Sequence, residues 1–132
     1  MSDGASVLLI EDDALLAGII QRYLGAHGHP VRVVASAEEA DTALIEERPA
    51  LVLLDINLPG DTGWSVLRTT AMCVADAPPA VIISASTVNA RRRRESGAAG
   101  YLPKPFPLET LLATVHRFIA DDHADPSIGE GV

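Results

Sequence analysis

The sequence lacks the features that mark membrane, disulfide-rich and nucleic-acid-binding proteins. Its only cysteine is Cys73, so no disulfide can form within the chain, which fits a reducing cytosol. No apolar run approaches the roughly 20 residues of a membrane span, and no basic residues precede the first apolar segment, so we expect neither membrane segment nor secretory signal. The formal net charge of -8 argues against nucleic acid as the main partner, because phosphate-backbone contacts need a positive surface. We therefore expect a cytoplasmic protein.

The composition is that of one folded domain with a short acidic end. With 132 residues, of which 48% are hydrophobic, the chain is long enough to bury a core and is not of a disordered type. There is no sign of an internal repeat or of a second domain. Residues 1–120 are expected to form the domain. Residues 121–132 offer little to bury and are expected to be a flexible acidic tail.

Apolar runs and amphipathic segments alternate along the chain. Short apolar runs predict five strands, and helical stripes or capped polar segments predict a helix after each of them. The strands are expected at residues 6–10, 31–35, 50–55, 80–84 and 100–103. Five such alternations predict an α/β fold, in which a parallel sheet carries helices on both faces through right-handed crossovers.

Several helix starts and surface positions are predicted from local signals. Asp13 is interpreted as the N-cap of the first helix, whose apolar stripe begins at Leu15. Ser36 followed by Glu39 fits a capping box at the second helix. The histidines have no metal-ligand spacing and are expected at the surface; they are His27, His29, His116 and His123.

The third strand ends in a carboxylate. Residues 51–54 are Leu-Val-Leu-Leu and run directly into Asp55, and Pro59 and Gly60 then turn the chain. In open α/β sheets, ligands bind at the carboxyl ends of the strands. We interpret Asp55 as a nucleophile that accepts a phosphoryl group, because a carboxylate can form an aspartyl-phosphate.

Polar side chains follow the other strands as well and are expected to meet Asp55 at one edge of the sheet. Glu11 and Asp12 follow the first strand, Ser84 ends the fourth, and Lys104 follows the fifth. Three carboxylates repel one another unless a cation joins them, and Mg²⁺ is the hard dication that best suits oxygen ligands. Mg²⁺, the Lys104 ammonium and the Ser84 hydroxyl would position a phosphoryl group and neutralise its charge.

Taken together, these motifs resemble a response-regulator receiver domain over about residues 5–120. The resemblance rests on five pieces in the family's order and at close to its spacing, and five together are specific where one alone is weak. The pieces are Leu9-Ile10-Glu11-Asp12-Asp13, Asp55-Ile56-Asn57-Leu58-Pro59, Gly63, Ser84-Ala85, and Tyr101-Leu102-Pro103-Lys104-Pro105-Phe106.

The resemblance implies a flavodoxin-like (βα)5 fold with strand order 2-1-3-4-5, an order taken from the family. It implies that Asp55 takes its phosphoryl group from the phosphohistidine of a histidine kinase or of a histidine phosphotransfer protein. Mg²⁺ would be bound by the side chains of Asp12 and Asp55 and by the backbone carbonyl of Asn57, with Glu11 acting through water. Lys104 would pair with the phosphate.

The resemblance also implies a switch. Ser84, with Ala85 beside it, would contact the phosphate, and Tyr101 would turn into the space that Ser84 leaves. The face formed by the fourth helix, fifth strand and fifth helix would then change shape for a downstream protein or a second copy of the chain. Asn57 and Ser86 flank the site and are expected to influence how long the phosphoryl group survives.

Two other functions stay open. A phosphatase that turns over an aspartyl-phosphate usually has a second acid two residues after the nucleophile, and Asn57 at that position cannot transfer protons. We therefore expect no enzyme beyond the domain's own phosphorylation and dephosphorylation. A phosphate-independent interaction domain is the second alternative, against which the intact acids argue. The chain itself could be a stand-alone regulator, a relay intermediate or a piece of a longer protein.

The segment between Ser84 and Lys104 departs from the family pattern, because it is slightly short and poor in apolar residues. A short helix ending at Gly97 is expected there. Its arginines, Arg91 to Arg94, form either a docking patch or a solvated helix face, and the solvated face is favoured.

Overall fold

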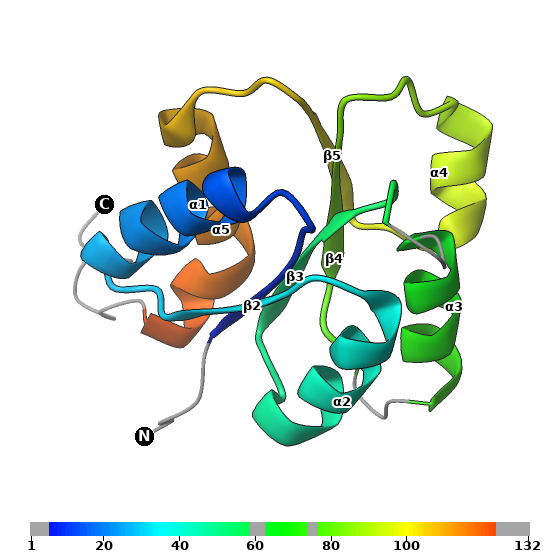
Figure 1. Cartoon of the computed structure of the whole chain (residues 1–132), viewed down its shortest axis with the longest axis horizontal. Helices are drawn as coiled ribbons and strands as arrows, with labels where there is room; N and C mark the ends of the chain where they lie inside the picture. Colours follow the sequence, from blue (N-terminus) through cyan, green and yellow to red (C-terminus); the bar gives the residue numbers. More distant parts are fainter. Residues whose placement is uncertain (1–5, 59–62, 74–76, 124–132) are drawn as a thin grey trace.

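The computed structural model describes residues 6–58, 63–73 and 77–123, which form a five-stranded parallel sheet with helices on both faces (Figure 1). The strand order is β2-β1-β3-β4-β5, as expected. The strands are β1 (Val7–Ile10), β2 (Val31–Val34), β3 (Leu51–Asp55), β4 (Ala80–Ser84) and β5 (Gly100–Pro103). The helices are α1 (Ala14–Ala26), α2 (Ala37–Glu47), α3 (Gly63–Cys73), α4 (Ala90–Ser96) and α5 (Leu108–His123).

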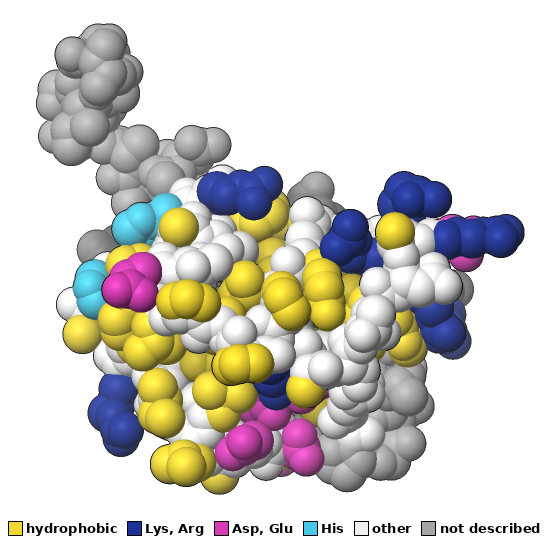
Figure 2. Space-filling view, turned by 90° about the horizontal axis from the view of Figure 1, so that it is seen from above, with side chains coloured by type: hydrophobic (Ala, Val, Ile, Leu, Met, Phe, Trp, Pro, Cys, Tyr) yellow, Lys and Arg dark blue, Asp and Glu magenta, His cyan; other side chains and the backbone are white. Residues whose placement is uncertain are grey.

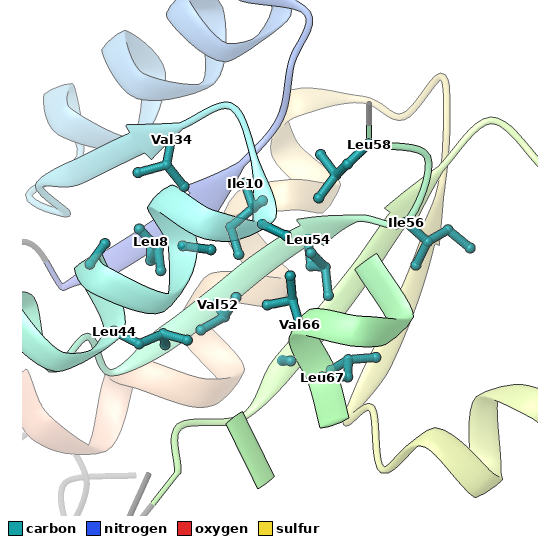
Figure 3. Close-up of a cluster of buried hydrophobic side chains, with 14 of the residues drawn as sticks. Leu8, Ile10, Val34, Leu44, Val52, Leu54, Ile56, Leu58, Val66 and Leu67 are labelled. Carbon is teal, nitrogen blue, oxygen red and sulfur yellow. The ribbon is translucent and has the colours of Figure 1, made fainter. Parts of the chain in front are cut away.

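Alternation along the buried strands divides the core into two layers. Side chains of one parity, such as Leu8 and Leu54, pack under α2 and α3, and Figure 3 shows Val66 and Leu67 of α3 against this layer. Side chains of the other parity, such as Leu9, pack against α1 and α5. Both faces of the central strands are therefore covered, which explains their continuous apolar runs.

The register aligns the ends of neighbouring strands. Ile10 of β1 is paired with Leu54 of β3, and Asp55 is paired with Ile83 of β4. Ser84 is paired with Pro103 at the end of β5. The residues that follow β1 and β5 therefore emerge beside the last residues of β3 and β4, which places widely separated parts of the sequence at one edge.

The predicted caps are present. The Asp13 side chain accepts hydrogen bonds from the backbone N–H groups of Leu15 and Leu16, so it caps α1. At α2 the hydroxyl of Ser36 accepts from the N–H of Glu39, and the Glu39 carboxylate accepts from the N–H of Ala35. The second bond reaches one residue further back than the usual capping box.

Three expectations differ from the structure. His29 was expected at the surface but is buried, and its ring lies 5.0 Å from that of His116 on α5. Leu15 was assigned to the apolar stripe of α1 but is 75% exposed. The helix α5 continues to His123, past the expected start of the tail at residue 121, while residues 124–132 lie outside the described residues.

The expected short helix in the arginine-rich segment is α4. Asn89 caps its start by accepting from the N–H of Arg92, and Gly97 ends it with a left-handed backbone, φ +82°. None of its residues is buried. Across the described part of the chain, every helix is too short or too polar to cross a membrane.

Candidate functional site

Three carboxylates meet at the carboxyl edge of the sheet. Asp55 is the last residue of β3 and is buried, and Glu11 directly follows β1 and is buried as well. Asp12, the next residue, is exposed. One carboxylate oxygen from each lies within 4.8 Å of the others, so the three could hold a metal ion together. Only oxygen donors are offered, which fits a hard cation such as Mg²⁺.

Lys104 is the counter-charge of this cluster. Its ammonium donates to Glu11 Oε1 at 2.7 Å and to Asp55 Oδ2 at 2.9 Å. The backbone N–H of Lys104 donates to the carbonyl of Ser84 at 2.9 Å. This bond holds the backbone of Lys104 beside the end of β4. The ion pairs join the first, third and fifth strands in one charged group.

Burial and charge act against each other on these groups. Burial raises the pKa of the Glu11 carboxyl above its ordinary value, although Lys104 and the N–H of Asp13 favour its charged form. Burial lowers the pKa of Lys104, but its hydrogen bonds to Glu11 and Asp55 and their charges outweigh burial, so its pKa is raised. Lys104 therefore keeps its positive charge in the cluster.

A hydrogen-bond chain leads from Asp55 to the end of β4. The backbone N–H of Asn57 donates to Asp55 Oδ1 at 2.9 Å. The side-chain amide of Asn57 donates to Ser86 Oγ at 2.9 Å and to Ser84 Oγ at 3.3 Å. The N–H of Ser86 donates to Ser84 Oγ at 3.0 Å, and the Ser84 side chain is fully buried. A change at Asp55 can reach Ser84 through Asn57.

The chain continues to the fifth strand. The hydroxyl of Tyr101 donates to the carbonyl of Ser86 at 3.1 Å, and its half-buried ring packs on the core layer under α3. Ala85 is exposed between Ser84 and Ser86. The structure thus connects Asn57, Ser84, Ser86 and Tyr101, while Ala85 takes no part in these bonds.

Gly63 lets α3 begin close against the end of β3. A Cβ at this position would lie 2.6 Å from Cα of Ile56 and 2.8 Å from the carbonyl oxygen of Asp55. The N–H of Gly63 donates to the carbonyl of Ile56 at 3.0 Å. Any larger residue would displace the backbone that carries Asp55.

An apolar hollow of about 540 Å³ adjoins the charged cluster, and the sequence did not reveal it. Lys104 lines its edge. Its apolar walls come from α1, from the β5–α5 connection and from the first residue of α5, namely Leu15, Leu16, Ile19, Phe106 and Leu108. Figure 2 shows hydrophobic side chains gathered beside acidic ones on this face. The helical spacing of apolar residues in α1 was the only pattern that could have indicated this hollow. That spacing is the same for a leucine in the core and for a leucine that borders a surface hollow.

Comparison with known proteins agrees with this geometry. The family model of the response regulator receiver domain matches residues 7–116. The DNA-binding response regulator MtrA of Mycolicibacterium paratuberculosis is 35% identical over 123 residues, which cover 92% of this chain and 54% of that protein. The chain therefore spans about half the length of this relative.

Solved receiver domains share the fold of this chain. The BeF3-activated N-terminal receiver domain of Klebsiella pneumoniae RstA is 30% identical and aligns with a TM-score of 0.78, covering 86% of this chain and 97% of that one. The receiver domain of the sensor histidine kinase PA1611 from Pseudomonas aeruginosa, solved with a magnesium ion coordinated in its active-site cleft, is 28% identical. Its TM-score is 0.77, and the match covers 89% of this chain and 98% of that one. With its strand order, acidic cluster and family match in agreement, the chain belongs to the response regulator receiver domain family.

Proposed function

We propose that the chain is the phosphoacceptor module of a two-component or phosphorelay system and that Asp55 receives the phosphoryl group. The observation that carries the proposal is the buried Asp55 carboxylate at the strand edge, held between the Lys104 ammonium and two further carboxylates. The donor is the phosphohistidine of a histidine kinase or of a histidine phosphotransfer protein. The output is a change in the face formed by α4, β5 and α5, which a downstream protein or a second copy of the chain reads.

The donor set suits Mg²⁺. The side chains of Asp12 and Asp55 and the backbone carbonyl of Asn57 would hold the ion, with Glu11 acting through water; three acids within 4.8 Å of one another support this assignment. When bound, Mg²⁺ supplies positive charge opposite the oxygens of the transferring phosphoryl group. The magnesium site named for the PA1611 receiver domain supports the choice of ion.

The transfer step uses few groups of the chain. A carboxylate oxygen of Asp55 attacks phosphorus, the P–N bond to the donor histidine breaks, and the imidazole leaves with a proton from solvent. Lys104, which contacts Asp55 Oδ2 before transfer, then pairs with a phosphoryl oxygen and stabilises the added negative charge. Asn57 keeps its backbone N–H on Asp55 Oδ1 and so fixes the orientation of the carboxyl group.

The switch begins at Ser84. Its hydroxyl oxygen accepts hydrogen bonds from the N–H of Ser86 and from the amide of Asn57, which leaves its own O–H available for a phosphoryl oxygen. Moving Ser84 toward the phosphate strains its bond with Ser86, whose carbonyl holds the hydroxyl of Tyr101. Release of Tyr101 alters β5 beside α4. A few kcal/mol of preference for one state is enough for such a population shift.

The proposed protein donor docks at the apolar hollow beside Lys104. A phosphohistidine must approach Asp55 from the carboxyl edge, and the hollow opens at that edge with exposed apolar walls such as Leu15. An apolar patch beside a polar reacting centre suits a protein surface that presents one histidine. Small phosphodonors need no such surface.

The chain is proposed to catalyse only its own phosphorylation and dephosphorylation. The side-chain amide of Asn57 is occupied with Ser84 and Ser86 and cannot act as an acid or base toward a leaving group. The bonding of Asn57 therefore favours a site that holds a phosphoryl group as a signal, and it argues against a phosphatase that acts on external substrates.

Incubation with acetyl phosphate tests the proposal. With Mg²⁺ present, intact-mass spectrometry should detect one added phosphoryl group that hydroxylamine removes, as expected for an acyl phosphate. Chelation of the metal and the variant Asp55→Asn should each abolish the addition, and Asp12→Asn should weaken it. Asp13→Asn is the matched control, because Asn also caps a helix and Asp13 faces the N–H groups of Leu15 and Leu16.

Labelling that persists in Asp55→Asn would show that another residue accepts the phosphoryl group. A wild-type protein that neither takes up phosphate nor binds Mg²⁺ would favour the phosphate-independent interaction domain.

A further inference from the structure

The helix α4 concentrates positive charge in an acidic chain. Four of its seven residues are the consecutive arginines Arg91 to Arg94, and Glu95 is its one acid. The chain as a whole carries a formal net charge of -8. Figure 2 shows arginine side chains standing out at the side of the molecule where Figure 1 places α4. We call this set, Arg91 to Arg94, the basic face of α4.

Two of the four arginines lie on aromatic rings. The guanidinium of Arg92 lies 4.5 Å from the ring centroid of Trp64 on α3, and that of Arg93 lies 5.5 Å from the ring centroid of Tyr101 on β5. Because α4 buries none of its own residues, these contacts help to position it. These ring contacts also restrict the two side chains before any partner arrives, which reduces the entropy lost on binding.

The other two arginines share the outer side of the helix. Arg91 and Arg94 are three positions apart and are therefore neighbours on one helical face. The Arg91 side chain is 80% exposed, and it pairs at 3.0 Å with Glu95, which is 66% exposed. An exposed pair at this spacing contributes only about 0.3–0.5 kcal/mol, so a partner carboxylate can replace Glu95 readily.

The donors of the basic face are largely unused. Among the residues that the structure describes, Arg91 is the one member of the set with a carboxylate partner. A guanidinium carries its N–H donors at the rim of its own plane, so one that contacts a ring can still meet a carboxylate in a bidentate pair. The face therefore combines fixed geometry, positive charge and free hydrogen-bond capacity.

We propose that the basic face of α4 is a docking surface for an acidic segment of a partner protein. The helix is about 10 Å long at 1.5 Å per residue, which matches a short run of Asp and Glu side chains. Nucleic acid fits less well, because a phosphate backbone extends beyond one short helix and would meet an acidic protein. The inference names the chemistry of the partner at the face of α4, β5 and α5 and rests on the proposed function for the role of that face. Peptide binding to the unphosphorylated chain tests it separately from phosphorylation of Asp55.

Binding of a labelled octaglutamate peptide tests the proposal. The wild-type chain should bind it with an affinity that falls as salt rises, and the backbone amide signals of α4 and the indole signal of Trp64 should shift in ¹H–¹⁵N spectra. The variant Arg91→Glu/Arg94→Glu should bind at least about tenfold more weakly, because like charges then face each other. The variant Arg91→Lys/Arg94→Lys should retain most of the affinity.

The matched control is Arg22→Glu/Arg117→Glu. Both residues are exposed, on α1 and α5 at the other face of the sheet, and this variant changes the net charge by the same amount. It should bind the peptide within about twofold of the wild type, since exposed charges far from the contact are screened by salt.

Three results would overturn the proposal. The first is that the control variant binds the peptide as weakly as the α4 variant does, which would show that net charge alone explains the weaker binding. The second is the absence of salt-dependent peptide binding by the wild type. The third is tighter binding of a short DNA duplex than of the peptide at the same ionic strength, which would assign the face to nucleic acid.

Discussion

Lys104 and Glu11 form the shortest ion pair among the described residues, with 2.7 Å between Nζ and Oε1, although they lie 93 positions apart in the chain. The same ammonium contacts Asp55 at 2.9 Å. One cation thus offsets two buried carboxylates that would otherwise repel each other at the end of the sheet. Its removal should affect both stability and phosphorylation.

Replacing Lys104 by Met should destabilise the metal-free protein by about 2–3 kcal/mol, because two buried carboxylates lose their counter-charge. This loss of unfolding free energy is smaller than for a fully buried ion pair, because the Lys104 side chain is 17% exposed. Mg²⁺ should restore part of it by neutralising the same acids. Urea unfolding with and without Mg²⁺ measures both effects.

The control for this change is Arg32→Met. Arg32 also bridges two acids, Glu46 at 3.0 Å and Glu47 at 3.1 Å, but its side chain is 34% exposed. Its loss should destabilise the protein much less than the loss of Lys104 does, because solvent screens an exposed pair, and it should not respond to Mg²⁺. A Lys104→Met variant as stable as Arg32→Met would show that the buried cluster does not need its cation.

The raised pKa of Glu11 predicts how stability depends on pH in the absence of metal. Burial is the largest cause, so the folded protein keeps the Glu11 proton to higher pH than the unfolded chain does. As pH rises between the unfolded and folded pKa values, the folded state binds more protons, and stability falls. Glu11→Gln should remove this contribution, so its unfolding free energy should decline less over that range. An identical slope in wild type and variant would contradict the assignment.

Gly63→Ala should destabilise the protein by about 1–3 kcal/mol and slow phosphorylation of Asp55, because overpacking displaces backbone. The added Cβ would meet Cα of Ile56 at 2.6 Å. Gly18→Ala in α1 is the matched control: nothing lies within 4 Å of its Cβ position. This control should stabilise the protein by about 0.5–1 kcal/mol through helix propensity. Thermal unfolding and acetyl phosphate labelling distinguish the two.

Leu15→Asp should slow phosphoryl transfer from a protein donor but not from a small-molecule donor. The apolar hollow that Leu15 lines is proposed to receive the donor protein, so transfer from a phosphorylated histidine phosphotransfer protein should slow about tenfold or more, while labelling by acetyl phosphate should stay within about twofold. Ile45→Asp is the control, since Ile45 is similarly exposed, 72% against 75%, but lies on α2. Equal slowing by both variants would contradict docking at the hollow.

The edge of the sheet could be predicted from the sequence because local patterns determine it. The run of apolar residues that ends in Asp55 predicted a buried strand with its carboxylate at the end, and the alternation of elements predicted that Glu11 and Lys104 reach the same edge. Asp13 and Ser36 were predicted as caps because capping depends on neighbours within three residues. The strand order came from the family resemblance.

Contacts between elements could not be predicted in the same way. The helical spacing of apolar residues places Leu15 on the apolar side of α1. It borders a hollow because of how the connection after β5 lies beside α1, and the sequence does not show that placement. His29 is buried with its ring beside that of His116 on α5, a contact that no local pattern reports. The arginine run is solvent-exposed as expected, since α4 buries none of its residues, but the contacts of Arg92 with Trp64 and of Arg93 with Tyr101 were not predicted. Whether the face is also a docking surface stays a proposal.

The absence of any buried residue in α4 has a consequence for the dynamics of the domain. A helix without apolar anchors opens locally at a small fraction of the global unfolding free energy, so its amide hydrogens should exchange with solvent well before those of α1 or α5. In α4 the contacts of Arg92 with Trp64 and of Arg93 with Tyr101 take the place of buried apolar contacts. The helix α4, which contacts Tyr101 through Arg93, is therefore the element that a small energetic change at the strand edge displaces most easily.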